Sequence, residues 1–258
     1  YLLSFYGNMG KKEVNKYIFG LIGRDINYSF SKNYFLEKFS KNHLIDHTYK
    51  NFDIESIDSV STILNNKNIN GLNVTIPYKK KIIPYLDKIS NKAKEIGAVN
   101  TICFDDLHNS IGYNTDAYGF EKSLLEKVKV MPKYALILGT GGASLAVSYT
   151  LKKIGVKFKF VSRKADENNL SYSDLNKEII QRHSLIINTT PLGTYPKINY
   201  MPPLPYDSIQ KSNIFYDLTY NPSESLFLKK GKDKGCQTIN GLKMLVYQAE
   251  KSWDIWKK

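Results

Sequence analysis

The sequence predicts an α/β protein of two domains, and three observations support this. The chain has 258 residues, which exceeds an average single domain and is enough for two hydrophobic cores. Strand-like apolar runs alternate with helical segments, a pattern typical of parallel α/β sheets. A new apolar strand, residues 134–138, begins directly after Pro132 in the middle of the chain. We therefore expect residues 1–116 and 241–258 to form one domain and residues 117–240 the other.

The first elements set the position of a notable lysine. A strand is expected over residues 17–22, and a helix follows from about Ser31. A second strand is expected over residues 71–76, and Pro77 suits the first position of a helix after it. Lys79 would then lie in the first helical turn, where a cation meets the unfavourable end of the helix dipole.

Further elements continue the alternation in the second half of the chain. Residues 115–130 are expected to form a helix that ends before Pro132, since proline disfavours the helical conformation of the residue before it. A strand over 134–138, a helix over 143–154 and a strand over 157–161 follow in turn. No internal repeat interrupts this order, so a solenoid is not expected.

Composition excludes membrane and secreted classes. No apolar run approaches the roughly 18–20 residues that a membrane span needs. The first sixteen residues lack the basic start, long apolar stretch and cleavage site of a secretory signal, and we expect them to be a disordered or non-native extension. A cytoplasmic location is therefore expected.

Cysteine and histidine usage predicts neither a disulfide framework nor a metal site. Cys103 and Cys236 lie far apart in strand-like segments, and we expect both to be reduced core residues. The four histidines include one pair at helical spacing, but no glutamate lies between them in the metalloprotease pattern.

The formal net charge of +13 makes a nucleic-acid-binding module an alternative to be weighed. The lysines are scattered along the whole chain, and no stacking or groove-reading motif accompanies them. We therefore expect no nucleic-acid partner. A positive field concentrates anionic small molecules instead, which fits a carboxylate substrate and a phosphate-bearing cofactor.

The clearest motif is the segment 136–144, an apolar strand that ends in glycines and leads into a helix. Gly139 allows the tight turn, and Gly141 lets the backbone approach a pyrophosphate, which the N–H groups and dipole of the helix N-terminus stabilise. Ser144 stands where such loops usually have a third glycine. A purely structural turn is the alternative, but the strand before and the helix after favour a dinucleotide-binding loop.

The end of the next strand indicates which dinucleotide is preferred. A domain that prefers NAD usually places an acidic residue here to bind the ribose 2′-hydroxyl, whereas this chain has Arg163. A guanidinium fits a 2′-phosphate and stacks on adenine, which favours NADP. An exposed surface arginine is the alternative, and Asp166 and Glu167 nearby keep NAD compatible with the sequence.

Two serines lie just after the first strand, in the segment from Tyr28 to Ser31. The hydroxyls of Ser29 and Ser31 are two residues apart and could both reach one carboxylate. The alternative is a helix cap, because serine is a preferred N-cap residue.

The Asn-Thr-Asp segment 114–116 supplies an acidic neighbour for Lys79. Asp116 lies at a strand-to-helix junction and is expected to face a cleft. A carboxylate about 4 Å from an ammonium gains roughly 4 kcal/mol at an effective dielectric near 20, which outweighs the dipole penalty. Lys79 could then donate the proton that accompanies hydride transfer to a ketone, and its amine could take it back. A solvated basic face with Lys80 and Lys81, and a capping role for the acidic segment, are the alternatives.

Taken in order, these motifs resemble the shikimate dehydrogenase family over essentially the whole chain. The segments that carry the resemblance are 29–31, 73–79, 97–101, 114–116, 139–144, 188–190 and 240–248. Lys32 stands where the family commonly has proline, and Thr140 replaces the usual alanine. The family's second arginine after Arg163 is missing, which leaves strict NADP preference open.

The resemblance implies a substrate-binding, catalytic domain over residues 1–116 and 241–258 and a Rossmann-type NADP-binding domain over residues 117–240, separated by a cleft. It implies that Lys79 and Asp116 handle the proton. The substrate-binding residues it implies are Ser29 and Ser31 for the carboxylate, Thr75, Asn100 and Gln248 for ring hydroxyls, which Asp116 also binds, and Tyr220. The cofactor-binding residues it implies are Gly139, Gly141, Gly142, Ala143, Arg163, Thr189, Gly241 and Met244, the last near the nicotinamide.

The function that the resemblance implies is the NADPH-dependent reduction of 3-dehydroshikimate to shikimate, in aromatic amino acid biosynthesis. The partner is a small molecule, with no nucleic acid and no membrane, and the enzyme would be a monomer or a homodimer. Two alternatives stay open: a quinate/shikimate dehydrogenase with relaxed use of NAD and NADP, and a non-catalytic ligand-binding homologue.

Overall fold

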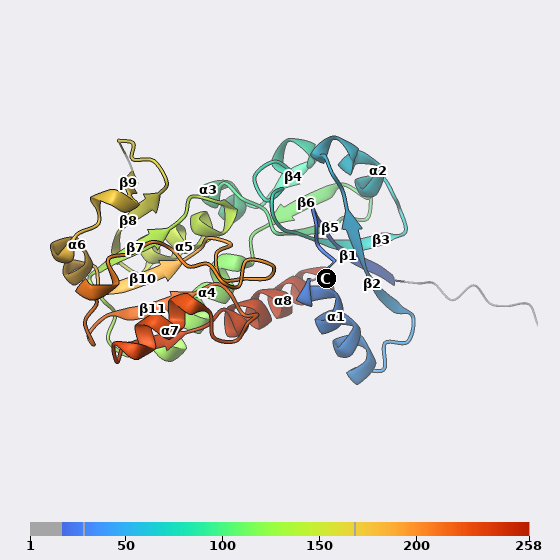
Figure 1. Ribbon diagram of the computed structural model, residues 1–258. Helices are drawn as coiled ribbons and strands as arrows, with labels where there is room; N and C mark the ends of the chain where they lie inside the picture. The colour runs from blue at the N-terminus through green and yellow to red at the C-terminus, as the bar shows by residue number, and fades with distance from the viewer. Residues whose placement is uncertain (1–16, 28, 168, 258) are drawn as a thin grey trace, which may run out of the picture.

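The computed structural model describes residues 17–27, 29–167 and 169–257, and within them it has two six-stranded sheets (Figure 1). The expected N-terminal extension, residues 1–16, and Tyr28 of the serine segment lie outside the described residues. No helix in the described part of the chain is long and apolar enough to span a bilayer.

The first sheet has the strand order β2-β1-β3-β5-β6-β4 and is mixed. Its strands are β1 (Tyr17–Gly23), β2 (His47–Asp53), β3 (Ile69–Val74), β4 (Lys88–Ile89), β5 (Thr101–Phe104) and β6 (Ser110–Tyr113). The pairs β3–β5 and β5–β6 are antiparallel, whereas β1 is parallel to both of its neighbours. The helices of this half are α1 (Phe30–Lys41), α2 (Val60–Leu64) and α3 (Asn91–Ile96).

The second sheet is parallel throughout and has the order β12-β11-β10-β7-β8-β9. Its strands are β7 (Tyr134–Leu138), β8 (Lys157–Ser162), β9 (Asn169–Ser171), β10 (Leu185–Asn188), β11 (Ile214–Asp217) and β12 (Gln237–Ile239). The helices α4 (Asp116–Lys127), α5 (Gly142–Lys153), α6 (Lys177–Arg182) and α7 (Leu226–Asp233) belong to this half. From β7 the chain continues to β8 and β9 on one side of β7, and it then crosses to β10 on the other side. The topological switch point therefore lies between β7 and β10. Ligands bind at such points, outside the carboxyl ends of the strands.

Both faces of the second sheet are buried, which explains the continuous apolar run of β7. Ala135 and Ile137 pack into one hydrophobic cluster with Phe120 of α4. Leu136 and Leu138 point to the opposite face and join another cluster. A parallel strand covered by helices on both sides needs apolar residues at successive positions.

The last helix, α8 (Leu242–Trp256), joins the two halves (Figure 1). Its first turns contribute Met244 to the core of the second sheet. Its later turns contribute Ala249 and Trp253 to a cluster with Phe19 and Phe35 of the first half. The expectation that the C-terminal helix crosses back to the first domain therefore agrees with its packing. The exact division at residues 116/117 and 240/241 stays a proposal.

The prediction of a helix after β3 is wrong. Lys79 lies in a series of turns instead. The carbonyl oxygen of Lys79 accepts the N–H of Val99 at 2.8 Å. The N–H of Ile83, which would reach that carbonyl in an α-helix, donates to the carbonyl of Lys80 at 3.4 Å. A tertiary hydrogen bond thus replaces the helical one, and the dipole argument for Lys79 no longer applies.

Candidate active site

A cavity of about 200 Å³ brings together the predicted catalytic pair and all six predicted substrate-binding residues. These lining residues are Lys79, Asp116, Ser29, Ser31, Thr75, Asn100, Tyr220 and Gln248. Three predicted cofactor residues, Ala143, Gly241 and Met244, line the same cavity. Because the wall combines residues from both halves of the chain, the cavity lies where the two sheets face each other.

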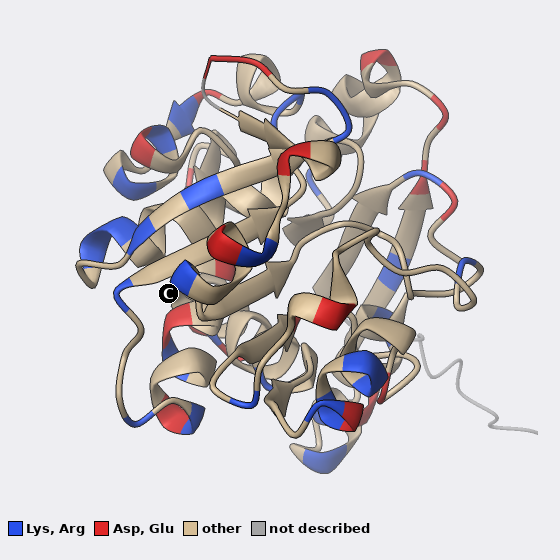
Figure 2. Cartoon of the chain, turned by 60° about the vertical axis from the view of Figure 1, so that its left-hand side comes forward, with Lys and Arg blue, Asp and Glu red and all other residues tan. Residues whose placement is uncertain are grey.

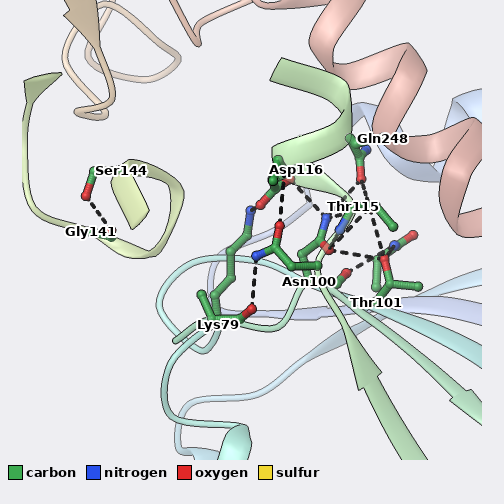
Figure 3. Close-up of polar contacts among 12 residues, drawn as sticks. Lys79, Asn100, Thr101, Thr115, Asp116, Gly141, Ser144 and Gln248 are labelled. Atoms are coloured by element: carbon green, nitrogen blue, oxygen red, sulfur yellow. Dashed lines mark hydrogen bonds and ion pairs between the residues drawn. The ribbon is translucent and has the colours of Figure 1, made fainter. Parts of the chain in front are cut away.

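Lys79 and Asp116 form an ion pair at the centre of this site (Figure 3). The Lys79 Nζ lies 2.6 Å from the Asp116 Oδ2, and the two side chains are only 15% and 6% exposed. Asn100 donates from Nδ2 to the other carboxylate oxygen of Asp116 at 2.9 Å. The aspartate therefore holds the ammonium on one oxygen and is itself held on the other.

The chain around Asp116 explains why this carboxylate points into the cavity. Asp116 is the first residue of α4, directly after the N-cap position. The Oδ1 of Asn114 accepts the N–H of Ala117 at 3.1 Å, so the Asn114 side chain, and not that of Asp116, bonds the first turn of the helix. The backbone N–H of Thr115 donates to the Oδ1 of Asn100 at 2.7 Å. Asp116 is thus free of the capping role and available to the lysine.

A buried polar network lies beside the pair (Figure 3). The Nδ2 of Asn100 lies 2.9 Å from the Thr115 hydroxyl and 3.2 Å from the Gln248 Oε1. The hydroxyls of Thr101 and Ser252 are 2.7 Å apart, and Thr101 also contacts Thr115 at 3.2 Å. Buried polar groups that satisfy one another fix a single arrangement, so this network orients the side chains that face the cavity.

Ser252 and Asn73 are members of this network whose roles sequence reasoning missed. Asn73 donates to the Ser252 hydroxyl at 3.1 Å and accepts from the buried Tyr49 hydroxyl at 2.9 Å. A signal for Ser252 was available, because it follows Gln248 by four residues and so shares its face of α8. No comparable local signal exists for Tyr49, which reaches Asn73 only through the pairing of separate strands.

Of the two serines at the start of α1, Ser29 takes the expected capping role, and both line the cavity. Ser29 is the N-cap residue, and its Oγ accepts the N–H of Ser31 at 3.3 Å. Both serines also line the cavity. The ring of Phe30, between them in sequence, packs against Tyr220 with centroids 5.6 Å apart, which connects this helix to the loop after β11.

The glycine loop after β7 makes a tight turn and leaves open space at the N-terminus of α5. Gly139 has a φ of +101°, and an added Cβ would lie 3.0 Å from the Thr189 Oγ1. A Cβ added at Gly141, the N-cap of α5, would meet no described atom within 4 Å. Within the described chain, no side chain caps this helix N-terminus. Open space beside unpaired N–H groups fits the pyrophosphate of a dinucleotide.

Two further predicted cofactor residues, Thr189 and Arg163, follow the strands on either side of β7 in the second sheet and do not line the cavity. Thr189, at the end of β10, donates its hydroxyl to the Leu138 carbonyl at 2.7 Å, which places it at the switch point. Arg163 follows β8 and is exposed, so its guanidinium is accessible to a ligand. Ser144, in place of the third glycine, donates to the Gly141 carbonyl at 2.7 Å. The architecture is that of dinucleotide-dependent oxidoreductases.

Comparison with known proteins identifies the family. Residues 21–102 match the shikimate dehydrogenase substrate binding domain. The shikimate dehydrogenase (NADP(+)) of Methanococcus aeolicus is 38% identical over 256 residues, covering 93% of this chain and 91% of the relative. A crystal structure of shikimate dehydrogenase in complex with NADP+ is similar with a TM-score of 0.82 at 33% identity, covering 93% and 90% of the two chains. The chain belongs to the shikimate dehydrogenase family.

A related enzyme with a different substrate name also shares the architecture. The quinate dehydrogenase of Corynebacterium glutamicum, in complex with NAD, is similar with a TM-score of 0.81 at 26% identity. The match covers 93% of each chain.

Asp217 is a buried carboxylate at the end of β11 whose importance the sequence analysis did not recognise. It accepts the Nδ2–H of Asn188 at 3.0 Å and the N–H of Thr219 at 2.9 Å on one oxygen, and the hydroxyl of Ser225 at 2.5 Å on the other. One carboxylate thus ties the ends of β10 and β11 to the start of α7. Burial raises the pKa of Asp217 from 3.8 to about 6, although these donors oppose the shift.

Asp217→Asn is expected to change how stability depends on pH. A carboxyl with a raised folded-state pKa stabilises the fold most below its unfolded value of 3.8, and this contribution is lost as pH rises through about 6. The variant lacks this dependence, so its stability relative to the parent should rise by about 2 kcal/mol from pH 4.5 to pH 8. Urea unfolding at both pH values measures this difference. Asp106→Asn, on the exposed loop between β5 and β6, is the matched control, and equal shifts for both variants would contradict the prediction.

Proposed function

We propose that this protein is a shikimate dehydrogenase that uses NADPH to reduce 3-dehydroshikimate to shikimate, a step of aromatic amino acid biosynthesis. The observation that carries the proposal is the ion pair of Lys79 and Asp116, with N and O 2.6 Å apart, in a cavity whose opposite wall includes Ala143 of the glycine loop. An acid–base pair next to a dinucleotide loop is the arrangement that ketone reduction requires.

The chain's own residues supply the proton chemistry. When bound, NADPH supplies the hydride that reduces the ketone carbon. The Lys79 ammonium donates a proton to the carbonyl oxygen as that oxygen becomes negatively charged, and the amine accepts the proton in the reverse reaction. Asp116 positions Lys79 and stabilises its charge, while Asn100 holds Asp116 at 2.9 Å. The buried position of the pair keeps bulk water away from the proton transfer.

The lining of the cavity suits a small hydroxylated carboxylate. We assign the carboxylate to the hydroxyls of Ser29 and Ser31, at the N-terminus of the 12-residue helix α1, where the helix dipole favours an anion. We assign the ring hydroxyls to Thr75, Asn100 and Gln248, which carry donors and acceptors in the same cavity. Tyr220 closes the lining beside them.

The cofactor assignment is supported by the glycine loop itself and by residues from neighbouring elements. The open space at Gly141 and the N-terminus of α5 suit the pyrophosphate. The exposed Arg163 after β8 suits a 2′-phosphate, which supports NADP over NAD. Gly241 and Met244 line the cavity from the start of α8, where the nicotinamide would meet the substrate.

A quinate/shikimate dehydrogenase is the second candidate, favoured by the shared architecture with the quinate dehydrogenase of Corynebacterium glutamicum.

We further propose that the enzyme acts in the cytoplasm as a monomer or a homodimer. The positions of Lys and Arg along the ribbon are spread over many elements in Figure 2 rather than gathered in one stripe, which supports a small-molecule partner rather than nucleic acid.

The initial rate of cofactor reduction by the purified protein tests the proposal. Shikimate and quinate are each assayed with NADP and with NAD, and we expect fast turnover only with shikimate and NADP. Comparable rates with quinate or NAD would favour the second candidate. Absence of turnover in all four mixtures, with shikimate binding retained, would indicate a non-catalytic binding protein.

A further inference from the structure

Lys80 contacts the glycine loop from the opposite wall of the site. Its Nζ donates to the carbonyl oxygen of Thr140 at 3.4 Å, although these residues are 60 positions apart in sequence. Lys80 is exposed, and no carboxylate of the described residues lies within ion-pair distance of its ammonium. Among the described residues, the partner of this ammonium is thus a neutral carbonyl oxygen at the edge of the glycine loop.

The side chain of Lys79, the residue before Lys80, is packed closely against the start of α5. A Cβ added at Gly142 would lie 2.9 Å from the Cβ of Lys79 and 3.5 Å from its Cδ. The segment that carries Lys80 is also anchored by the hydrogen bond from the Val99 N–H to the Lys79 carbonyl at 2.8 Å. The segment that carries Lys80 is thus held beside the glycine loop.

We propose that Lys80 is a further cofactor-binding residue whose ammonium binds the pyrophosphate of the dinucleotide. The inference rests on the proposed function, because it assumes a dinucleotide on the glycine loop. A pyrophosphate bound by the N–H groups after Thr140 would place negative charge within reach of the Lys80 ammonium, which contacts the Thr140 carbonyl oxygen. Charge-assisted hydrogen bonds to phosphate are stronger than bonds to a neutral carbonyl, and lysine acts on phosphate as a point charge.

Two basic residues would then bind different phosphate groups of the same cofactor. Lys80 would recognise the pyrophosphate, which NAD and NADP share. Arg163 would recognise the 2′-phosphate, which only NADP carries. The two basic residues therefore have different signatures when affinities for the two dinucleotides are compared.

The experiment measures dissociation constants by titration calorimetry for NADP and for NAD, with Lys80→Gln, Arg163→Gln and Lys81→Gln. Lys81 is the exposed neighbour of Lys80 and serves as the matched control. We expect Lys80→Gln to weaken both dinucleotides about fivefold at low salt, and less in 0.5 M salt because exposed charges are screened. Arg163→Gln should weaken NADP alone, and Lys81→Gln should resemble the parent protein.

The outcomes distinguish this inference from the proposed function. If the parent oxidises shikimate and binds NADP but Lys80→Gln behaves like Lys81→Gln, the Lys80 assignment is overturned and the function stands. Weakening of NADP alone by Lys80→Gln also overturns it, because the contact would then be with the 2′-phosphate. If the parent binds neither dinucleotide, the proposed function fails together with the inference.

Discussion

Lys79→Ala is expected to lower turnover by about 10²- to 10⁴-fold, the usual contribution of a positioned general acid, while leaving the affinity for shikimate within a few-fold of the parent. The reason is that Lys79 supplies the proton, whereas the other polar lining residues supply most of the contacts to the substrate. Steady-state kinetics with saturating cofactor, together with calorimetric titration of shikimate, measures both quantities. Lys81→Ala, at the exposed neighbour, is the matched control.

Stability must be followed in the same variant, because Lys79→Ala leaves the Asp116 carboxylate, 6% exposed, without its partner. Removing one member of a buried ion pair costs about 3–5 kcal/mol. The double variant Lys79→Met with Asp116→Asn removes both charges and should recover stability but not turnover. A loss of shikimate affinity as large as the loss of turnover, in a variant that remains folded, would show that Lys79 anchors the substrate rather than donating a proton.

Gly141→Ala is expected to weaken NADP binding by about 10- to 100-fold with little change in stability. The Gly141 backbone has a φ of −77° and a ψ of −175°, which alanine adopts readily, and its added Cβ would meet no described protein atom within 4 Å. The protein alone therefore does not require glycine here. A bound pyrophosphate does, since it would occupy that space, and steric crowding of 1.4–2.8 kcal/mol corresponds to about 10- to 100-fold in affinity. Calorimetric titration and thermal unfolding measure the two effects.

Gly155→Ala provides the reciprocal control at the other end of the same helix. Gly155 has a φ of +78°, and its added Cβ also meets no described atom within 4 Å. Alanine at positive φ costs about 1–2 kcal/mol, so this variant should lose stability and keep the parent's affinity for NADP. If Gly141→Ala binds NADP as tightly as Gly155→Ala does, the cofactor does not approach the loop at Gly141.

The sequence by itself determined the elements whose signals are local. The run before Gly139 predicted β7, because a strand buried on both faces is continuously apolar. The change from strand to glycines to helix predicted the loop and the start of α5, and Ser29 was correctly considered as an N-cap. The order of the motifs was enough to indicate the family, which the comparisons confirm.

Only the tertiary structure decided where groups distant in sequence meet. The turns around Lys79 formed instead of the expected helix because Val99, far along the chain, donates to the Lys79 carbonyl. Asp217 and Tyr49 belong to buried polar networks that join separate strands and helices, and no local pattern marks such partners. The contact of Lys80 with Thr140 likewise depends on how the two sheets face each other. Local propensity acts over a few residues, whereas hydrogen bonds and ion pairs across the cavity depend on packing that the whole chain creates.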